Sequence, residues 1–319
     1  MRIVAVAIAM LVAAGPCRAE GPPQNPPTGD WASIETVVVT AQAEGPAFWR
    51  VKKGDSEIWI LGTVNALPWG FAWNRTHLAE IIDGARVVLA PPEARAGFFE
   101  GSWFLLTHRG LLSMPDGKKL EESLPPDLRT RFVAARTALN LDADHFADDP
   151  PVLAAWKLQA NFDEKHKLGS DQPYRTVEKI AHDKHVPMRP VGIYEALSLL
   201  KEILRLPQDR QQACLEASVA NVEARAVHAV PAAEAWAVGN IKQIKAHYTG
   251  QIFERCAGAT PSFAKLRSQS IDSYIAAIDE ALAKPGKTVM IVDIGSLLRS
   301  TGVAEELHKE GVVIEGPAE

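Results

Sequence analysis

Residues 58–68 read Ile-Trp-Ile-Leu-Gly-Thr-Val-Asn-Ala-Leu-Pro. The first four residues are apolar and β-prone, and the glycine and polar residues after them indicate where a buried strand becomes a loop. A second β-rich run, Phe48–Val51, stands upstream and is joined to the first by Lys52–Ser56, a segment with a glycine in its turn. This pattern predicts a β-hairpin at the start of a globular part that begins near Pro46.

The end of the chain predicts a second strand-rich region. Thr288–Ile294 is a continuous apolar run typical of a buried strand, and it is followed by a helical stretch, Val303–Lys309, and a short strand, Val312–Ile314. Two shorter runs, Arg86–Leu89 and Val186–Val191, also predict buried strands. The end of the chain is therefore predicted to be a β-loop-α-β unit.

The middle of the chain is predicted to be largely helical. Prolines at 125–126 and 150–151 stand where helices begin, and the region from Pro207 to about Ala283 is expected to be helical, with breaks near Pro231 and at Gly258–Pro261. Strands at both ends with helices between them predict an α/β fold, with a mixed central sheet built from the N- and C-terminal strands and a largely helical middle.

The N-terminus predicts export. Arg2 precedes an apolar run, Ile3–Gly15, and Cys17-Arg18-Ala19 suits cleavage after Ala19, so residues 1–19 are expected to be a signal peptide and the protein to be periplasmic. The run is too short for an ordinary membrane span, and no later stretch is apolar enough for one. A lipid anchor on Cys17 is the alternative, but Pro16 stands where such a signal needs a small residue.

The charge balance argues against nucleic acid as a partner. The chain has 34 basic and 39 acidic residues, and removing Arg2 and Arg18 with the signal peptide leaves 32 against 39, a net charge of −7. Such a chain offers no broad basic face to phosphates.

Residues 20–45 are predicted to be a flexible leader that contains one β-prone segment, Glu35–Ala41. This segment resembles the TonB box of outer-membrane receptors, which docks by strand addition to a sheet edge. The alternative is an edge strand of the protein's own sheet or an inert tether. If the segment is a tether that awaits a partner, its deletion leaves the melting temperature unchanged.

Two cysteines, Cys214 and Cys256, remain after the predicted cleavage. In an oxidising compartment they can form a disulfide, and two separate buried thiols are the alternative. The sequence leaves both open.

Several motifs in order resemble those of the TraB/GumN family, to which the Tiki-type metalloproteases are related. The strand–loop segment 58–68 resembles the opening motif of the family. The segment Gly169–Asp171, then Val191-Gly192, and finally Val292–Leu297 follow in the order of the family. The resemblance covers about Ala47 to Ile314 and implies an α/β fold related to ChaN and erythromycin-esterase proteins. Its glycines, at 62, 192 and 295, are expected to shape tight turns at strand ends.

The resemblance also implies a metal-assisted hydrolase site, in which imidazoles and carboxylates hold a divalent ion that activates water. In this sequence the side chains implied as ligands are replaced by those of Asn65, Ala90, Tyr194 and Ser296. Asn is a weak ligand, Ala cannot ligate, and Tyr and Ser bind divalent ions poorly unless deprotonated. The family-type metal is therefore expected to be lost, and no cofactor is expected.

Two other polar residues are candidates for the same cleft. Arg267 matches the arginine of the family's Arg-Asn pair, and Asp293 is a carboxylate within an apolar strand, which is costly unless paired. Arg267 is the predicted partner of Asp293. Glu93 and Glu195 stand close to the substituted positions and can replace the lost acids if the alignment shifts by a few residues.

Three functions follow as hypotheses. The first is a periplasmic binding or accessory protein with an unknown ligand or envelope partner, which keeps the cleft of the family without its chemistry. The second is an active, peptidase-like hydrolase with rearranged ligands, drawn from Glu93, Glu195, Asp293 and Ser296. The third is an envelope protein that contacts TonB through Glu35–Ala41.

Overall fold

The computed structural model of this chain describes residues 31–32, 37–38, 45–64, 66–95, 106–169, 172–250, 256, 258 and 260–317. The predicted signal peptide, residues 1–19, and the candidate site residue Asn65 lie outside the described residues.

The predicted hairpin opens the globular part. β2 (Phe48–Lys53) pairs antiparallel with β3 (Ser56–Thr63). Along β3 the residues Ile58, Ile60 and Leu61 are fully buried. A strand that is apolar on both faces must lie inside a sheet that is covered on both sides, so β3 marks the centre of the molecule.

The described strands form one large sheet with the order β1-β11-β2-β3-β10-β5-β8. The C-terminal strand β10 pairs parallel with β3 and with β5, and β5 pairs parallel with β8. β2 runs antiparallel to both of its neighbours, β3 and β11, and β1 pairs parallel with β11. This mixed sheet, built from N- and C-terminal strands, confirms the predicted fold class. The remaining strands of this sheet are β1 (Val37–Val38), β5 (Val87–Ala90), β8 (Met188–Pro190), β10 (Gly286–Asp293) and β11 (Ile314–Gly316).

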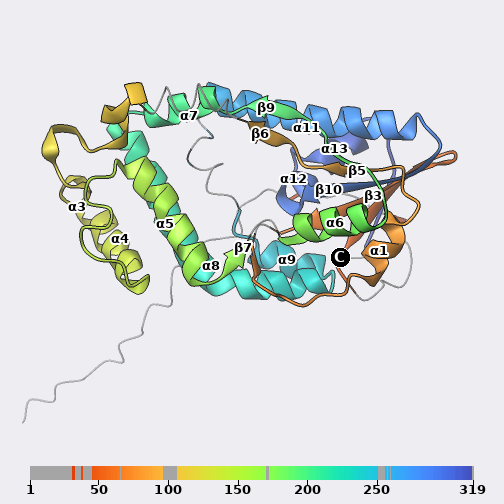
Figure 1. The fold of residues 1–319 in the computed structure, drawn as a ribbon, viewed down its shortest axis with the longest axis horizontal. Helices are drawn as coiled ribbons and strands as arrows, with labels where there is room; N and C mark the ends of the chain where they lie inside the picture. The colour runs from red at the N-terminus through yellow and green to blue at the C-terminus, as the bar shows by residue number, and fades with distance from the viewer. Residues whose placement is uncertain are drawn as a thin grey trace, which may run out of the picture.

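Helices cover both faces of the sheet. In Figure 1, α11 and α13 lie above the sheet, while α1, α6 and α9 lie below it. Between these layers the apolar side chains of the strands and helices form the principal core. The helices concerned are α1 (Thr76–Ile82), α6 (Gln172–Asp183), α9 (Ile241–His247), α11 (Pro261–Leu282), α12 (Ile294–Leu298) and α13 (Val303–Lys309).

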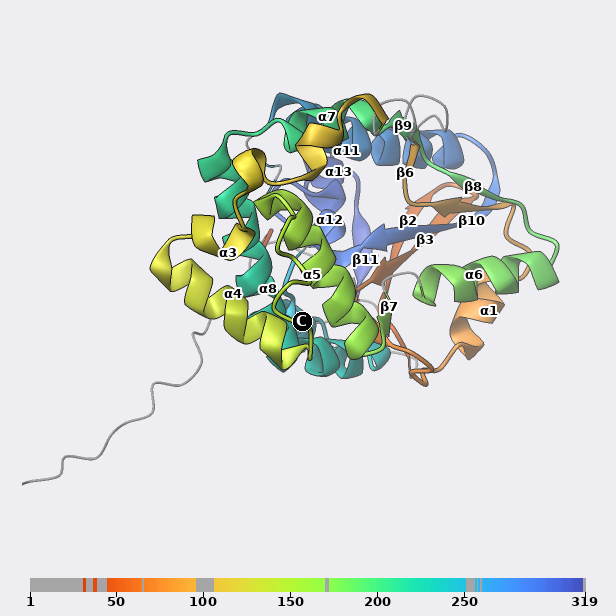
Figure 2. The same ribbon diagram turned by 60° about the vertical axis from the view of Figure 1, so that its left-hand side comes forward.

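A second, helical part lies beside the sheet, on the left in Figures 1 and 2. It has its own apolar cluster, which includes the fully buried Phe132 and Leu158. Its elements are the short 3-10 turns Arg109–Leu112 and Pro115–Gly117, and the helices α3 (Leu120–Ser123), α4 (Pro126–Ala138), α5 (Pro151–Lys165), α7 (Leu197–Leu204) and α8 (Gln208–Ala237). Two small sheets, β4 (Leu67–Pro68) with β7 (Leu168–Gly169) and β6 (Glu93–Arg95) with β9 (Ile193–Glu195), join the two parts.

The prolines act in two ways. α4 and α5 begin at Pro126 and Pro151, as predicted, because proline suits the first turn of a helix. The predicted break near Pro231 is wrong, since α8, which is 30 residues long, continues through it to Ala237. The proline removes the backbone donor to the carbonyl of Val227, but Val227 is exposed, so water can bind that carbonyl. Buried residues on both sides of the proline, up to Trp236, hold the helix in place.

Among the described helices, none is long and apolar enough to cross a membrane.

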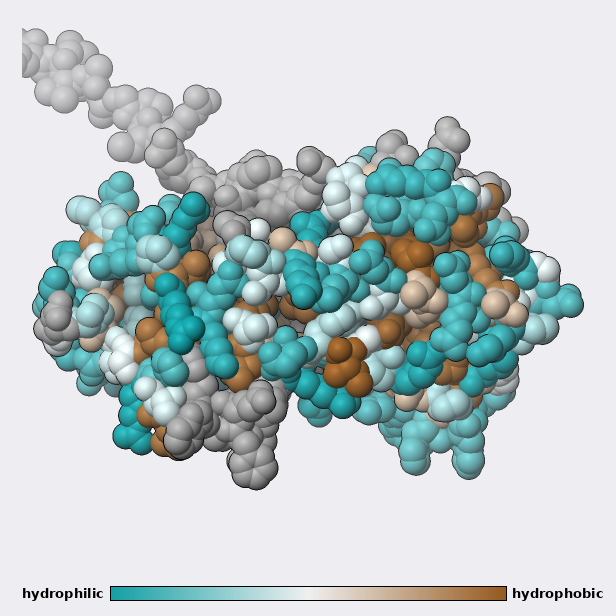
Figure 3. Space-filling view, turned by 90° about the horizontal axis from the view of Figure 1, so that it is seen from above, coloured by the Kyte–Doolittle hydropathy of each residue, from teal (hydrophilic) through white to brown (hydrophobic). Residues whose placement is uncertain are grey.

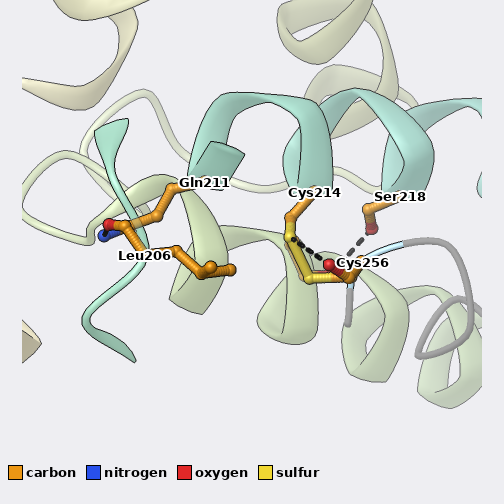
Figure 4. The surroundings of a disulfide bond; sticks show 6 residues. Leu206, Gln211, Cys214, Ser218 and Cys256 are labelled. Carbon is orange, nitrogen blue, oxygen red and sulfur yellow. Dashed lines mark hydrogen bonds between the residues drawn. A yellow bond between two sulfur atoms is a disulfide. The ribbon is translucent and has the colours of Figure 1, made fainter. Parts of the chain in front are cut away.

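Cys214 and Cys256, whose pairing the sequence left open, form a disulfide. Figure 4 shows Cys214 projecting from α8 toward Cys256, which precedes α11 in the chain. The bond therefore ties the helical part to the segment that leads into the long helix above the sheet.

The described parts of the leader lie against the globular part. β1 pairs parallel with β11, with Val37 opposite Glu315. Further upstream, the backbone amide of Ala32 donates to the carbonyl of Leu298 at 2.9 Å, and the ring of Trp31 packs edge-on against Tyr248 with 5.6 Å between centroids. Of the segment Glu35–Ala41, the structure thus describes Val37–Val38, and these two residues form an edge strand of the protein's own sheet. Contact with TonB stays a prediction.

Deletion of residues 35–41 is expected to lower the melting temperature by a few degrees. The deletion removes the β1–β11 pairing, and each lost backbone hydrogen bond costs about 1 kcal/mol, or roughly 2 °C for a chain of this size. Thermal unfolding followed by circular dichroism measures the change. Deletion of residues 22–28, upstream of Trp31, is the matched control and should leave the melting temperature unchanged. If the two deletion variants have equal melting temperatures, the segment is a tether and does not stabilise the sheet.

Candidate functional site

A cavity of about 460 Å³ lies where the parallel strands end. Its wall includes Thr63 at the end of β3, Asp293 at the end of β10, and Pro91 directly after β5. α11 closes the other side. In open α/β sheets ligands bind at the carboxyl ends of the parallel strands, so this is the position where a site is expected.

Seen from the side of α7 and α11, the surface of the molecule is mainly hydrophilic with separate hydrophobic patches (Figure 3).

Four of the six sequence-predicted site residues line this cavity: Tyr194, Arg267, Asp293 and Ser296. They come from β9, α11, the end of β10 and α12, which are far apart in the sequence. Ala90 ends β5 but is only 1% exposed and does not line the cavity. The strand-end position that the resemblance assigns to a carboxylate therefore holds a buried methyl group.

Asp293 is held by hydrogen bonds at the bottom of the cavity. It ends β10 and caps α12, because its Oδ1 accepts from the backbone amide of Ser296 at 3.1 Å. The same oxygen accepts from the hydroxyl of Tyr248 at 3.0 Å. Tyr248, at the end of α9, was not predicted from the sequence, because nothing in its local pattern shows that α9 ends beside β10.

The predicted pairing of Arg267 with Asp293 is wrong. Both side chains line the cavity, but within the described residues no ion pair joins them. Arg267 instead donates from Nη2 to Oγ1 of Thr301 at 2.6 Å. The cost of placing Asp293 in an apolar strand is offset by the helix cap and by the tyrosine hydroxyl.

Tyr194 is anchored through its hydroxyl. The hydroxyl donates to the carbonyl of Gln269 at 2.8 Å and lies 2.5 Å from Oγ of Ser273, both on α11. Burial raises the pKa of the neighbouring Tyr274, and the charge of Asp293 raises it further, so its hydroxyl stays protonated on the cavity wall. The hydroxyl of Tyr194 is thus engaged with α11.

The two alternative acids face away from the cavity. Ala94 and Tyr194 are opposite each other in the β6–β9 pair and line the cavity, so the adjacent Glu93 and Glu195 project to the other face. Glu93 accepts hydrogen bonds from Arg95, and Glu195 caps α7 by accepting from the backbone amide of Leu197 at 2.9 Å.

The glycines of the motifs serve close packing, so the expectation of tight turns is wrong. A Cβ on Gly62 would lie 2.6 Å from the ring of Trp49, and one on Gly295 would lie 2.3 Å from the hydroxyl of Tyr248. A Cβ on Gly192 would lie 2.7 Å from the hydroxyl of Tyr194. Two of the three glycines thus leave room for tyrosine hydroxyls at the cavity.

The described wall of the cavity does not fit the implied metal. It supplies one carboxylate, Asp293, and no imidazole or thiolate. A transition-metal site of the implied kind needs three or four such donors. Elsewhere too, the part of the chain that the structure describes holds no group of three or more His, Cys, Asp or Glu side chains that could bind a metal ion.

Comparison with known proteins gives one result. The model of the TraB/PrgY/gumN family matches residues 47–316, which is most of the chain. No curated protein and no solved structure matches.

Proposed function

Since the chain belongs to the TraB/PrgY/gumN family, we propose that it is an exported, periplasmic member that binds a small ligand without metal-dependent hydrolysis. One observation carries the proposal. Tyr194, Arg267, Asp293 and Ser296 line a single cavity at the strand ends, and the described wall of that cavity provides one carboxylate as its metal donor.

The cavity suits binding better than hydrolysis. Pro91 and Ile271 are among its apolar wall residues, and hydroxyls and guanidinium groups stand between them, a mixture typical of small-molecule pockets. Oδ1 of Asp293 is already occupied as an acceptor for Tyr248 and for the amide of Ser296. These bonds hold Asp293 in a structural role, and metal-assisted hydrolysis would in addition need the metal donors that the described wall lacks.

The periplasmic location rests on two features. The N-terminal segment has the pattern of a signal peptide cleaved after Ala19. In addition, the Cys214–Cys256 disulfide suits an oxidising compartment.

The second hypothesis, a hydrolase with rearranged ligands, draws on Glu93, Glu195, Asp293 and Ser296, and of these four the two glutamates do not line the cavity. The β6–β9 pairing directs both carboxylates to the opposite face. A shift of one residue in the pairing would bring them in, but it would also remove Tyr194 from its hydrogen bonds with α11.

Purified protein is expected to contain much less than one Zn, Mn or Co per chain, measured by elemental analysis. These ions should not raise the melting temperature. A ligand present at 1,000 times its dissociation constant would add about 4 kcal/mol to the free energy of unfolding, so the assay has sufficient range.

The double variant Asn65→His with Ser296→His is expected to gain no activity, because Ala90 and Tyr194 still lack carboxylates. One transition-metal ion per wild-type chain contradicts the proposal. Metal-dependent peptidase turnover that is lost in Glu93→Ala or Asp293→Ala also contradicts it. Either result would favour the hydrolase with rearranged ligands.

A further inference from the structure

We propose that the strand-end cavity binds a small amphiphilic monocarboxylate and that Arg267 holds its carboxylate group. This inference rests on the proposed binding function and names the class of ligand. It follows from the charges on the cavity wall, from the donors that Arg267 keeps, and from the apolar surface around them.

The charged residues of the described wall sum to one positive charge. They are Arg267, Arg299 and Asp293. The negative charge of Asp293 is stabilised by the hydroxyl of Tyr248 and the amide of Ser296. A single positive charge matches a carboxylate, whereas a phosphate monoester carries between one and two negative charges at neutral pH.

Arg267 keeps donors for a ligand. Its Nη2 donates to Thr301 at 2.6 Å, and within the described residues it forms no ion pair with a carboxylate. The guanidinium carries five N–H donors in a planar fork, so most of them stay available to an incoming carboxylate. The bond to Thr301 fixes the side chain, which lowers the entropy lost when an anion binds.

Hydroxyl and apolar groups complete the site. Ser270, one turn along α11 from Arg267, and Ser296 also line the cavity, and their hydroxyl groups donate no hydrogen bond within the described residues. Phe263, Leu266 and Ile271 cover the same wall with apolar surface. A carboxylate at Arg267 can thus lie beside hydroxyl donors while its hydrocarbon body covers apolar side chains.

The surroundings determine the side from which the anion reaches Arg267. On the other side of α11, Arg267 also borders a groove with four acidic residues, Asp272, Asp279, Glu306 and Glu310. These carboxylates repel an anion, whereas the strand-end cavity has a positive balance. The carboxylate is therefore expected to approach from the strand-end cavity.

Isothermal titration calorimetry with octanoate and its neutral analogue octanamide tests the proposal on the purified protein. Wild type should bind octanoate roughly tenfold more tightly than octanamide, as hydrogen bonds to a charged group are stronger than neutral ones. Arg267→Gln should remove this preference, and Arg267→Lys should retain part of it. Lys265→Gln, which removes a positive charge from the same helix outside the cavity, should change neither affinity.

A cavity-filling variant locates the binding. Ala94→Trp places a large ring in the cavity from an exposed strand position and should weaken both probes. Equal binding of the two probes by wild type, or a preference that survives Arg267→Gln, overturns the carboxylate inference and leaves the binding function standing. Failure of wild type to bind either probe also overturns the inference, and the metal measurements then decide the proposed function separately.

Discussion

Loss of the Cys214–Cys256 disulfide is expected to lower the free energy of unfolding by about 4 kcal/mol, because the bond closes a loop of roughly forty residues in the unfolded chain. The two cysteines are 42 residues apart in the sequence. At roughly 2 °C per kcal/mol for a chain of this size, the melting temperature should fall by about 8 °C. Thermal unfolding of the purified protein with and without a reductant measures the effect.

The double variant Cys214→Ala with Cys256→Ala is the control for the reductant. It should melt at the lower temperature in both conditions, since Cys214 is 1% exposed and alanine fills its site without a buried polar atom. Two thiols that react with an alkylating reagent in the denatured, unreduced protein would contradict the disulfide itself.

Trp236→Ala is expected to destabilise the protein by about 3–5 kcal/mol, the usual cost of removing a buried tryptophan. Trp236 on α8 is fully buried and packs edge-on against Trp73, with 5.0 Å between ring centroids. Its Nε1 donates to the carbonyl of Gly62 at 2.7 Å, at the end of β3. The substitution thus leaves a cavity below the strand ends together with an unsatisfied carbonyl.

Two further variants separate these causes in urea unfolding. Trp236→Phe keeps most of the ring but loses the hydrogen bond, so about 1–3 kcal/mol is expected. Trp69→Ala removes a tryptophan that is 58% exposed and should cost less than about 1 kcal/mol. If Trp236→Ala costs no more than Trp69→Ala, α8 does not support β3 as described.

The sheet was predictable because its strands are local signals. The apolar run at 288–294 and the hairpin around Gly54 appear directly in the sequence, and β10 and the β2–β3 hairpin form there. The rule that proline breaks a helix fails at Pro231, because the rule concerns an isolated helix. In α8 the packing of residues before and after the proline outweighs the lost hydrogen bond.

The site was predictable only in part. The family motifs brought together Tyr194, Arg267, Asp293 and Ser296, which line one cavity. The hydrogen-bond partners were not predictable, because Tyr248 and Thr301 lie in segments whose approach to the cavity depends on the packing of whole helices. A sequence pattern shows which face of a helix is apolar, but not which residue at its end meets a distant strand.

The pairing of β3 with β10 has a consequence for how the chain folds. Ser56 lies opposite Gly286, so the two central strands are 286 − 56 = 230 residues apart. Pairings between such distant residues require a large loop to close before any contact forms, and folding is correspondingly slow. During synthesis the sheet therefore cannot close until the last few dozen residues have left the ribosome, and until then β3 has only its hairpin partner. A chain that must cross a membrane before it folds would gain from this delay, because its central strand finds its second neighbour only when almost the whole polypeptide has been delivered.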